Sequence, residues 1–237
     1  MRRLSSFSLR LLALACMLVD HAGLALFPAV GAFRCIGRLS FPIYCFLLVQ
    51  SYAHSHDIRA YGRRLLLLAL LSEIPFDLLI FGRIASSVEQ NVFFSLIFGL
   101  ITIQSADALR DKPLYAGLAA AALAMGAMIC RVSFGWLGVA LCLCMHSFAA
   151  RRLRMAAVTA GVLLIYSLSL LLSGVTMSWV LVSLCALLSL VPLLLYNGKR
   201  GPRTPLLTFA FYAAYPLHIV CLLIIRFLRI IPPYFLR

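Results

Sequence analysis

Ionisable residues interrupt three long apolar stretches of this chain, and their types could do acid–base chemistry. They are Asp20 and His21 in the first stretch, Glu73 and Asp77 in the third, and His218 in the last. An ionisable side chain in hydrocarbon is costly, so it usually faces a packed or hydrated interior and carries function. A neutral imidazole can accept a proton from an amine or a hydroxyl nucleophile. The neighbouring Asp20 could orient such an imidazole or pair with Arg38.

The composition indicates the class of protein in which these residues lie. The chain has 237 residues, of which 64% are hydrophobic and 12% are charged, whereas a soluble domain has roughly 25% charged residues. We therefore predict an all-α, polytopic transmembrane helical bundle that forms a single integral-membrane domain over residues 1–237. The net charge of +14 could suggest nucleic acid, but the basic residues are spread between apolar stretches, which argues against it. The eight cysteines are expected to be reduced.

Stretches long enough to cross a bilayer, which takes about 20 apolar residues, predict about nine spans. They are Leu9–Phe27, Phe33–Ala53, Arg64–Phe81, Val92–Ala108, Leu114–Ile129, Phe134–Ala149, Met155–Leu172, Met177–Tyr196 and Leu206–Ile230. We interpret the first as a retained helix rather than a signal peptide, because Asp20 and His21 follow its apolar run without a clear cleavage site.

Lysine and arginine residues predict the orientation of these spans. With the N-terminus in the cytoplasm, fourteen of them lie on the cytoplasmic side and seven on the other, which the positive-inside rule favours. The ionisable residues of the first, third and last spans then share the outer half of the membrane. We therefore expect one polar chamber there.

Two carboxylates and two prolines are expected to shape this chamber. Glu73 and Asp77 are four residues apart and share a helix face, where they could line the chamber or form ion pairs that assemble the helices. Pro75 lacks an N–H and frees the carbonyl of the residue four before it, and Pro216 does the same in the last span. Gln90 and Asn91 open the fourth span and could contact a substrate or simply cap the helix.

Two polar clusters at cytoplasmic ends carry weaker signals. Arg59, Arg63 and Arg64 could bind phosphate through forked hydrogen bonds, or could serve topology and lipid headgroups. His54, His56 and Asp57 lack further ligands, so we expect no metal site there.

Several segments together resemble one family. They are Val19-Asp20-His21, Ile36-Gly37-Arg38-Leu39-Ser40-Phe41-Pro42-Ile43, Ser72-Glu73-Ile74-Pro75-Phe76-Asp77, Gln90-Asn91-Val92-Phe93-Phe94 and Phe211-Tyr212-Ala213-Ala214-Tyr215-Pro216-Leu217-His218. In order and content they resemble the TraX family of bacterial membrane proteins. A departure occurs at Arg131–Gly138, where the family pattern leads us to expect an acidic or polar D-Y-G-like element and the chain has Val132-Ser133-Phe134-Gly135.

The resemblance implies a multi-pass acetyltransferase of the bacterial cytoplasmic (inner) membrane, similar to the wider transmembrane acyltransferases. Its acetyl donor would be acetyl-CoA, a co-substrate, and its acceptor a pilin N-terminus or another surface molecule with an amine or hydroxyl. On this reading acetyl-CoA binds near Arg59, Arg63 and Arg64 on the cytoplasmic face.

The same resemblance assigns roles in the chamber. His21 would be the general base and Asp20 would orient it or balance its charge, while Arg38 would stabilise the oxyanion. His218 would be the reserve base or a substrate contact. Glu73 and Asp77 would position Arg38 or the acceptor, and Gln90 and Asn91 would contact the substrate at the chamber mouth.

Two other classes of protein fit the same residues. Buried Asp, Glu and His also form the proton relays of a proton-coupled transporter or permease. A non-catalytic assembly factor for a surface structure would need the helices but not His21.

Overall fold

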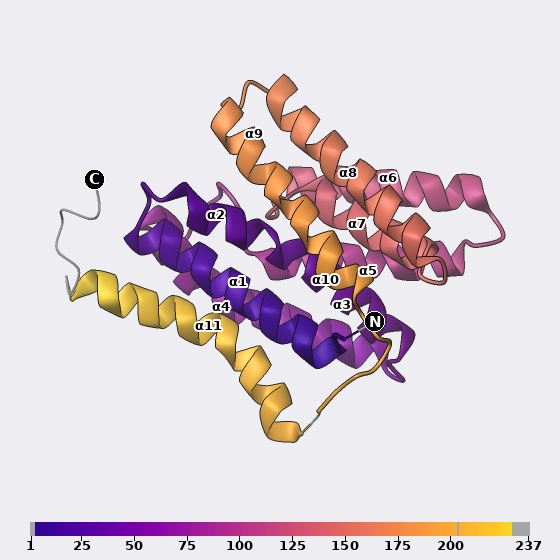
Figure 1. The fold of residues 1–237 in the computed structure, drawn as a ribbon, viewed down its shortest axis with the longest axis horizontal. Coiled ribbons are helices and arrows are strands. Elements are labelled where there is room, and N and C mark those ends of the chain that lie inside the picture. The colour runs from indigo at the N-terminus through magenta and orange to yellow at the C-terminus, as the bar shows by residue number, and fades with distance from the viewer. Residues whose placement is uncertain (1–2, 203, 229–237) are drawn as a thin grey trace.

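Helices make up every regular element in the described part of the chain, as predicted. A computed structural model describes residues 3–202 and 204–228 (Figure 1). The first half contains α1 (Ser6–Leu26), α2 (Gly31–Arg38), α3 (Ser40–Ala53), α4 (Ile58–Phe81) and α5 (Val92–Ala108). The second half contains α6 (Pro113–Ile129), α7 (Trp136–Ser147), α8 (Arg152–Leu172), α9 (Met177–Leu184), the 3₁₀ helix η1 (Cys185–Ser189), α10 (Leu190–Leu194) and α11 (Pro205–Phe227).

The lengths and surfaces of these helices are those of a membrane protein. Five segments of the described chain are long and apolar enough to cross a bilayer, and α5, α6 and α7 are shorter apolar helices. The 24-residue α4 is also long, but it carries charged residues in its interior. Large apolar side chains such as Leu67, Leu71, Leu172 and Leu206 are exposed on the outer faces, where lipid would cover them. The number of nine spans and the cytoplasmic N-terminus stay predictions.

Two expected spans are interrupted in the structure. The second is divided into α2 and α3 at Leu39, because Pro42 has no N–H to bond the carbonyl of Arg38. Ser40 adds a hydrogen bond from Oγ to the carbonyl oxygen of Gly37 at 2.7 Å. The eighth contains the 3₁₀ turn η1 before Pro192. The expected end of the last span at residue 230 lies outside the described residues.

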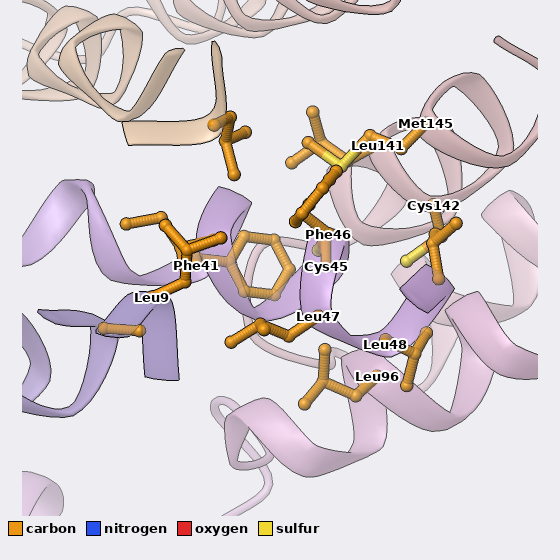
Figure 2. Packing of buried hydrophobic residues seen from close by; sticks show 14 of the residues in the cluster. Leu9, Phe41, Cys45, Phe46, Leu47, Leu48, Leu96, Leu141, Cys142 and Met145 are labelled. Carbon is orange, nitrogen blue, oxygen red and sulfur yellow. The ribbon is translucent and has the colours of Figure 1, made fainter. Parts of the chain in front are cut away.

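The largest core surrounds α3. Phe41, Ile43, Phe46 and Leu48 of this helix are almost fully buried on several of its faces, which is the pattern of a helix enclosed by others. Figure 2 shows Phe41, Phe46 and Leu48 among residues of α1, α5 and α7. None of the eight cysteines, all of which lie in the described residues, forms a disulfide in the structure.

A second core joins α1, α4 and α11, the three helices that carry Asp20, His21, Glu73, Asp77 and His218. Met17, Phe76, Tyr215 and Ile219 are buried together here. In Figure 1, α11 lies along α1 and bends part of the way along its length, which the proline in its interior, Pro216, explains. This core sets the distance between the two histidine-bearing helices.

The chain before α1 is fastened to the segment before α11. Leu4 pairs with Tyr196, and the N–H groups of Ser6 and Phe7 donate to the carbonyl oxygens of Lys199 and Arg200. These bonds hold the segment between α10 and α11 against the start of α1.

Close contact between α5 and α7 depends on a glycine. A Cβ atom at Gly99 would press on the side chain of Cys142 and approach the carbonyl oxygen of Gly138. At Gly117 in α6 a Cβ atom would meet nothing within 4 Å, so the two positions form a matched pair.

We predict that Gly99→Ala lowers the free energy of unfolding by about 1–3 kcal/mol through overpacking, whereas Gly117→Ala leaves it unchanged or raises it. Thermal unfolding in detergent measures both, and Cys142→Ala should restore part of the stability of Gly99→Ala. Equal stability of the two alanine variants would contradict this packing.

Candidate functional site

His21 of α1 and His218 of α11 form a direct hydrogen bond. Nδ1 of His21 lies 2.6 Å from Nε2 of His218, and the two rings are nearly parallel with their centroids 4.9 Å apart. The other ring nitrogen of His218, Nδ1, lies 2.9 Å from the carbonyl oxygen of Ala214. The structure thus brings together the two histidines that the sequence placed at similar depth.

This chain of contacts determines where the protons lie. A carbonyl oxygen only accepts, so Nδ1 of His218 must donate to Ala214. When both rings are neutral, Nε2 of His218 is then an acceptor and receives the Nδ1–H of His21. The lone pair left over is on Nε2 of His21, which is where a general base needs it. His218 orients His21 in the way that a carboxylate orients histidine in other enzymes.

Aromatic rings enclose the pair on one side. The ring of Tyr215 meets His21 edge-on at 5.9 Å and His218 at 5.4 Å between centroids. Phe93 of α5 in turn packs edge-on against Tyr215 at 4.8 Å. Tyr215 is only 4% exposed, so it fixes the orientation of the histidines from within the core.

Asp20 faces away from the pair and toward α2. Its Oδ1 lies 2.9 Å from Nη1 of Arg34, and a Cβ atom at Gly37 would overlap its carboxylate. The ion pair that we considered between Asp20 and Arg38 is therefore made by Arg34 instead. Consecutive helix residues point about 100° apart, which is why Asp20 and His21 meet different neighbours.

Arg38 lies above the ring of Phe134, with its Cζ atom 5.6 Å from the ring centroid. Phe134 also stacks on Phe41 at 4.0 Å. The guanidinium of Arg38 is thus placed by an aromatic stack at the start of α7.

The polar residues expected to contact substrate mostly join α4 to α5. Oε2 of Glu73 accepts hydrogen bonds from the backbone N–H and the side-chain amide of Asn91, at 3.2 and 2.5 Å. Asn91 is fully buried and caps α5 by accepting from the N–H of Phe93. Oδ2 of Asp77 accepts from the N–H of Ser86 at 2.7 Å. These bonds fix the loop between the two helices.

Gln90 connects this loop to the stretch where the family pattern departs. Its N–H donates to the carbonyl oxygen of Arg131 and its carbonyl oxygen accepts from the N–H of Ser133. Ser133 also donates to Oε1 of Glu89 at 2.6 Å. Arg131 and Phe134 both have positive φ angles, so this turn is tightly held.

Two cavities lie between α1, α3, α4 and α11 and share part of their walls. The first, of about 170 Å³, reaches the helix ends near Arg64 and Arg200. The second, of about 120 Å³, reaches Met17, Phe93 and Tyr215 beside the histidine pair. Both are lined by residues that include Arg10, Tyr61 and Tyr212, so we describe them together as the groove.

Residues at helical spacing lead along the groove to each histidine. On α1 they are Arg10, Leu14 and Met17, followed by His21, and on α11 they are Thr208, Tyr212 and Tyr215, followed by His218. The rise from Arg10 to His21 is about 16 Å. Sequence analysis gave the groove residues before each histidine no role in the site, although their spacing of three or four back from a buried histidine marks the face that it shares.

The basic cluster on α4 only partly joins the groove. Arg64 lines it, whereas Arg59 and Arg63 are exposed at the same end of the helix and do not. Arg10 and Arg200, which the sequence analysis did not single out, line it as well. Phosphate groups could therefore meet three arginines from three different segments.

The cluster of His54, His56 and Asp57, which we expected on the cytoplasmic side, has structural contacts. Asp57 caps α4 by accepting from the N–H of Ala60 at 2.8 Å, and Nδ1 of His54 lies 2.8 Å from the carbonyl oxygen of Gln50. Within residues 3–202 and 204–228, no three His, Cys, Asp or Glu side chains gather closely enough to hold a metal ion.

Comparisons with known proteins agree with the resemblance to the TraX family that the sequence segments indicated. The family model described as TraX protein matches residues 5–226. A relative from Dichelobacter nodosus, named "Probable fimbrial assembly protein FimC, serogroup H1", is 31% identical over 92% of this chain and 94% of its own length. No solved structure matches the chain. The chain belongs to the TraX family.

Proposed function

We propose that this protein is a membrane-embedded acetyltransferase of the bacterial inner membrane. It moves an acetyl group from acetyl-CoA to an amine or hydroxyl acceptor, with His21 as the general base. The observation that carries the proposal is the groove, which runs from three arginines to Tyr215, the tyrosine whose ring contacts both histidines of the hydrogen-bonded pair.

The groove suits the shape and charge of CoA. Its basic end offers Arg10, Arg64 and Arg200 to the phosphates. Its narrower part is lined by apolar and tyrosine side chains and would take the pantetheine arm. Since the predicted orientation puts the basic end at the cytoplasm, CoA enters from the compartment that contains it.

The histidine pair supplies the proton transfer. Nε2 of His21 takes the proton of the acceptor N–H or O–H as the acceptor atom attacks the thioester carbonyl carbon. The C–S bond then breaks, and the proton passes from His21 to the departing CoA thiolate. His218 holds His21 in the correct orientation through Nδ1.

The family and the relative suggest where the acceptor comes from. The relative's name refers to fimbrial assembly, and the resemblance to the TraX family implies pilin acetylation. A pilin subunit is therefore the first acceptor to test, and another cell-surface molecule is the second.

A proton-coupled transporter receives less support from the geometry. The carboxylates that such a relay would use are held by partners, Asp20 by Arg34, Glu73 by Asn91 and Asp77 by the N–H of Ser86.

We predict that His21→Gln lowers kcat for acceptor-dependent CoA release by about 10²–10⁴, the usual contribution of a general base. His218→Gln should keep a larger share of the activity, because an amide oxygen can still accept the Nδ1–H of His21. Purified protein in nanodiscs with acetyl-CoA and a membrane extract measures both.

Thermal unfolding of each glutamine variant serves as the control for folding. A wild-type protein that neither releases CoA nor gains thermal stability with acetyl-CoA would reject the enzyme. An active His21→Gln beside an inactive His218→Gln would exchange the two roles.

Charge reversal at Arg64, with the same change at the neighbouring Arg63 as the control, tests the CoA site. We predict that Arg64→Glu raises the KM for acetyl-CoA about tenfold, since hydrogen bonds to charged groups contribute about 1.5–3 kcal/mol, with little change in kcat. Arg63→Glu, which changes the same charge outside the groove, should leave the KM near that of the wild type. Equal effects of both substitutions would place CoA elsewhere.

A further inference from the structure

The groove ends at Tyr215, a residue with a buried hydroxyl that the histidine pair does not use. Tyr215 lines the groove and is 4% exposed. Within the described part of the chain, its Oη atom makes no hydrogen bond of acceptable geometry. A buried polar atom without a partner is costly, and in a native structure it calls for an explanation.

The beginning of α5 lies beside this hydroxyl. Val92 is the first residue of this 17-residue helix and also lines the groove, and its N–H is close to Oη of Tyr215. The first N–H groups of a helix have no partner within the helix, and they concentrate positive potential at its N-terminus. The next N–H, that of Phe93, is already used by Oδ1 of Asn91.

From this arrangement we propose that Tyr215 is a catalytic residue whose hydroxyl, at the N-terminus of α5, donates a hydrogen bond to the carbonyl oxygen of the acyl thioester. The inference rests on the proposed function and adds the group that stabilises the oxyanion. The oxyanion role that the resemblance implied for Arg38 then passes to Tyr215.

The position of Tyr215 relative to the histidines suits this role. A thioester in this end of the groove lies against the tyrosine that contacts both imidazole rings. His21 can then take the acceptor proton on one side of the carbonyl carbon while Tyr215 contacts its oxygen. Donors already in place where charge develops need no reorganisation during the reaction.

The step balances without a further reactant. The acceptor atom forms a bond to the carbonyl carbon, and the π electrons of the C=O bond move to the oxygen, which Tyr215 O–H then binds. When the carbonyl reforms, the C–S bond breaks and CoA leaves as the thiol with the proton that His21 removed. Tyr215 keeps its own proton throughout.

Tyr44 offers a matched control in the same wall. It also lines this part of the groove, but its hydroxyl contacts Sδ of Met17 at 4.0 Å. Tyr44→Phe and Tyr215→Phe therefore remove the same atom from two places in one cavity.

The direct test is infrared spectroscopy of S-acetonyl-CoA, an unreactive ketone analogue labelled with ¹³C at its carbonyl, bound to the full chain in nanodiscs. We expect the wild type and Tyr44→Phe to lower the carbonyl stretching frequency relative to the analogue in an aprotic solvent, and Tyr215→Phe to lose that shift. In turnover, Tyr215→Phe should lose about 10²–10³ in kcat, as for one oxyanion donor, with the KM for acetyl-CoA unchanged.

The outcomes separate the two claims. A wild type that does not bind the analogue rejects the proposed function and this inference with it. A wild type that binds the analogue while Tyr215→Phe retains both the shift and kcat overturns the inference alone. If Tyr215→Phe fails to fold, 3-fluorotyrosine at position 215 keeps the hydroxyl and makes it a stronger donor, so an unchanged carbonyl frequency would likewise overturn it.

Discussion

A single hydrogen bond between α1 and α11, from Nδ1 of His21 to Nε2 of His218, is the interaction on which the account depends. It joins residues 197 positions apart in the sequence, so it exists only because the two helices pack along each other. The carbonyl oxygen of Ala214 anchors its far end and thereby sets the direction of donation. The free lone pair on His21 follows from that direction.

The surrounding polar contacts hold the helices that frame this bond. Arg34 fixes Asp20 between α1 and α2, and Asn91 fixes Glu73 between α4 and α5. Buried polar groups without partners would be costly in a membrane, so these pairs also determine which helices can be neighbours. These contacts leave a space between α1, α3, α4 and α11, and this space is the groove that ends at Tyr215 beside His21.

The sequence predicted the helices and the ionisable residues of the site better than it predicted which side chains pair with each other. Apolar length and charge placed most helices close to their observed bounds, although α4 begins at Ile58 rather than Arg64 and two expected spans are divided. Similar depth placed His21 near His218. Depth says nothing about which way a side chain points, so the pairing of Asp20 with Arg34 could not be derived. Arg10, Arg200 and Tyr215 were given no role in the site because arginine near a helix end and tyrosine in an apolar helix are common. Their place in the groove depends on how α11 packs on α1.

The measurement that tests the central claim most directly is solid-state ¹⁵N NMR of the membrane-embedded protein with labelled histidine, assigned by comparison with His21→Gln and His218→Gln. With both rings neutral, the account predicts that His21 and His218 each carry their proton on Nδ1 and that a coupling crosses the bond between the rings. A proton on Nε2 of neutral His21, with Nδ1 bare, would contradict it, because the base would then face the wrong way.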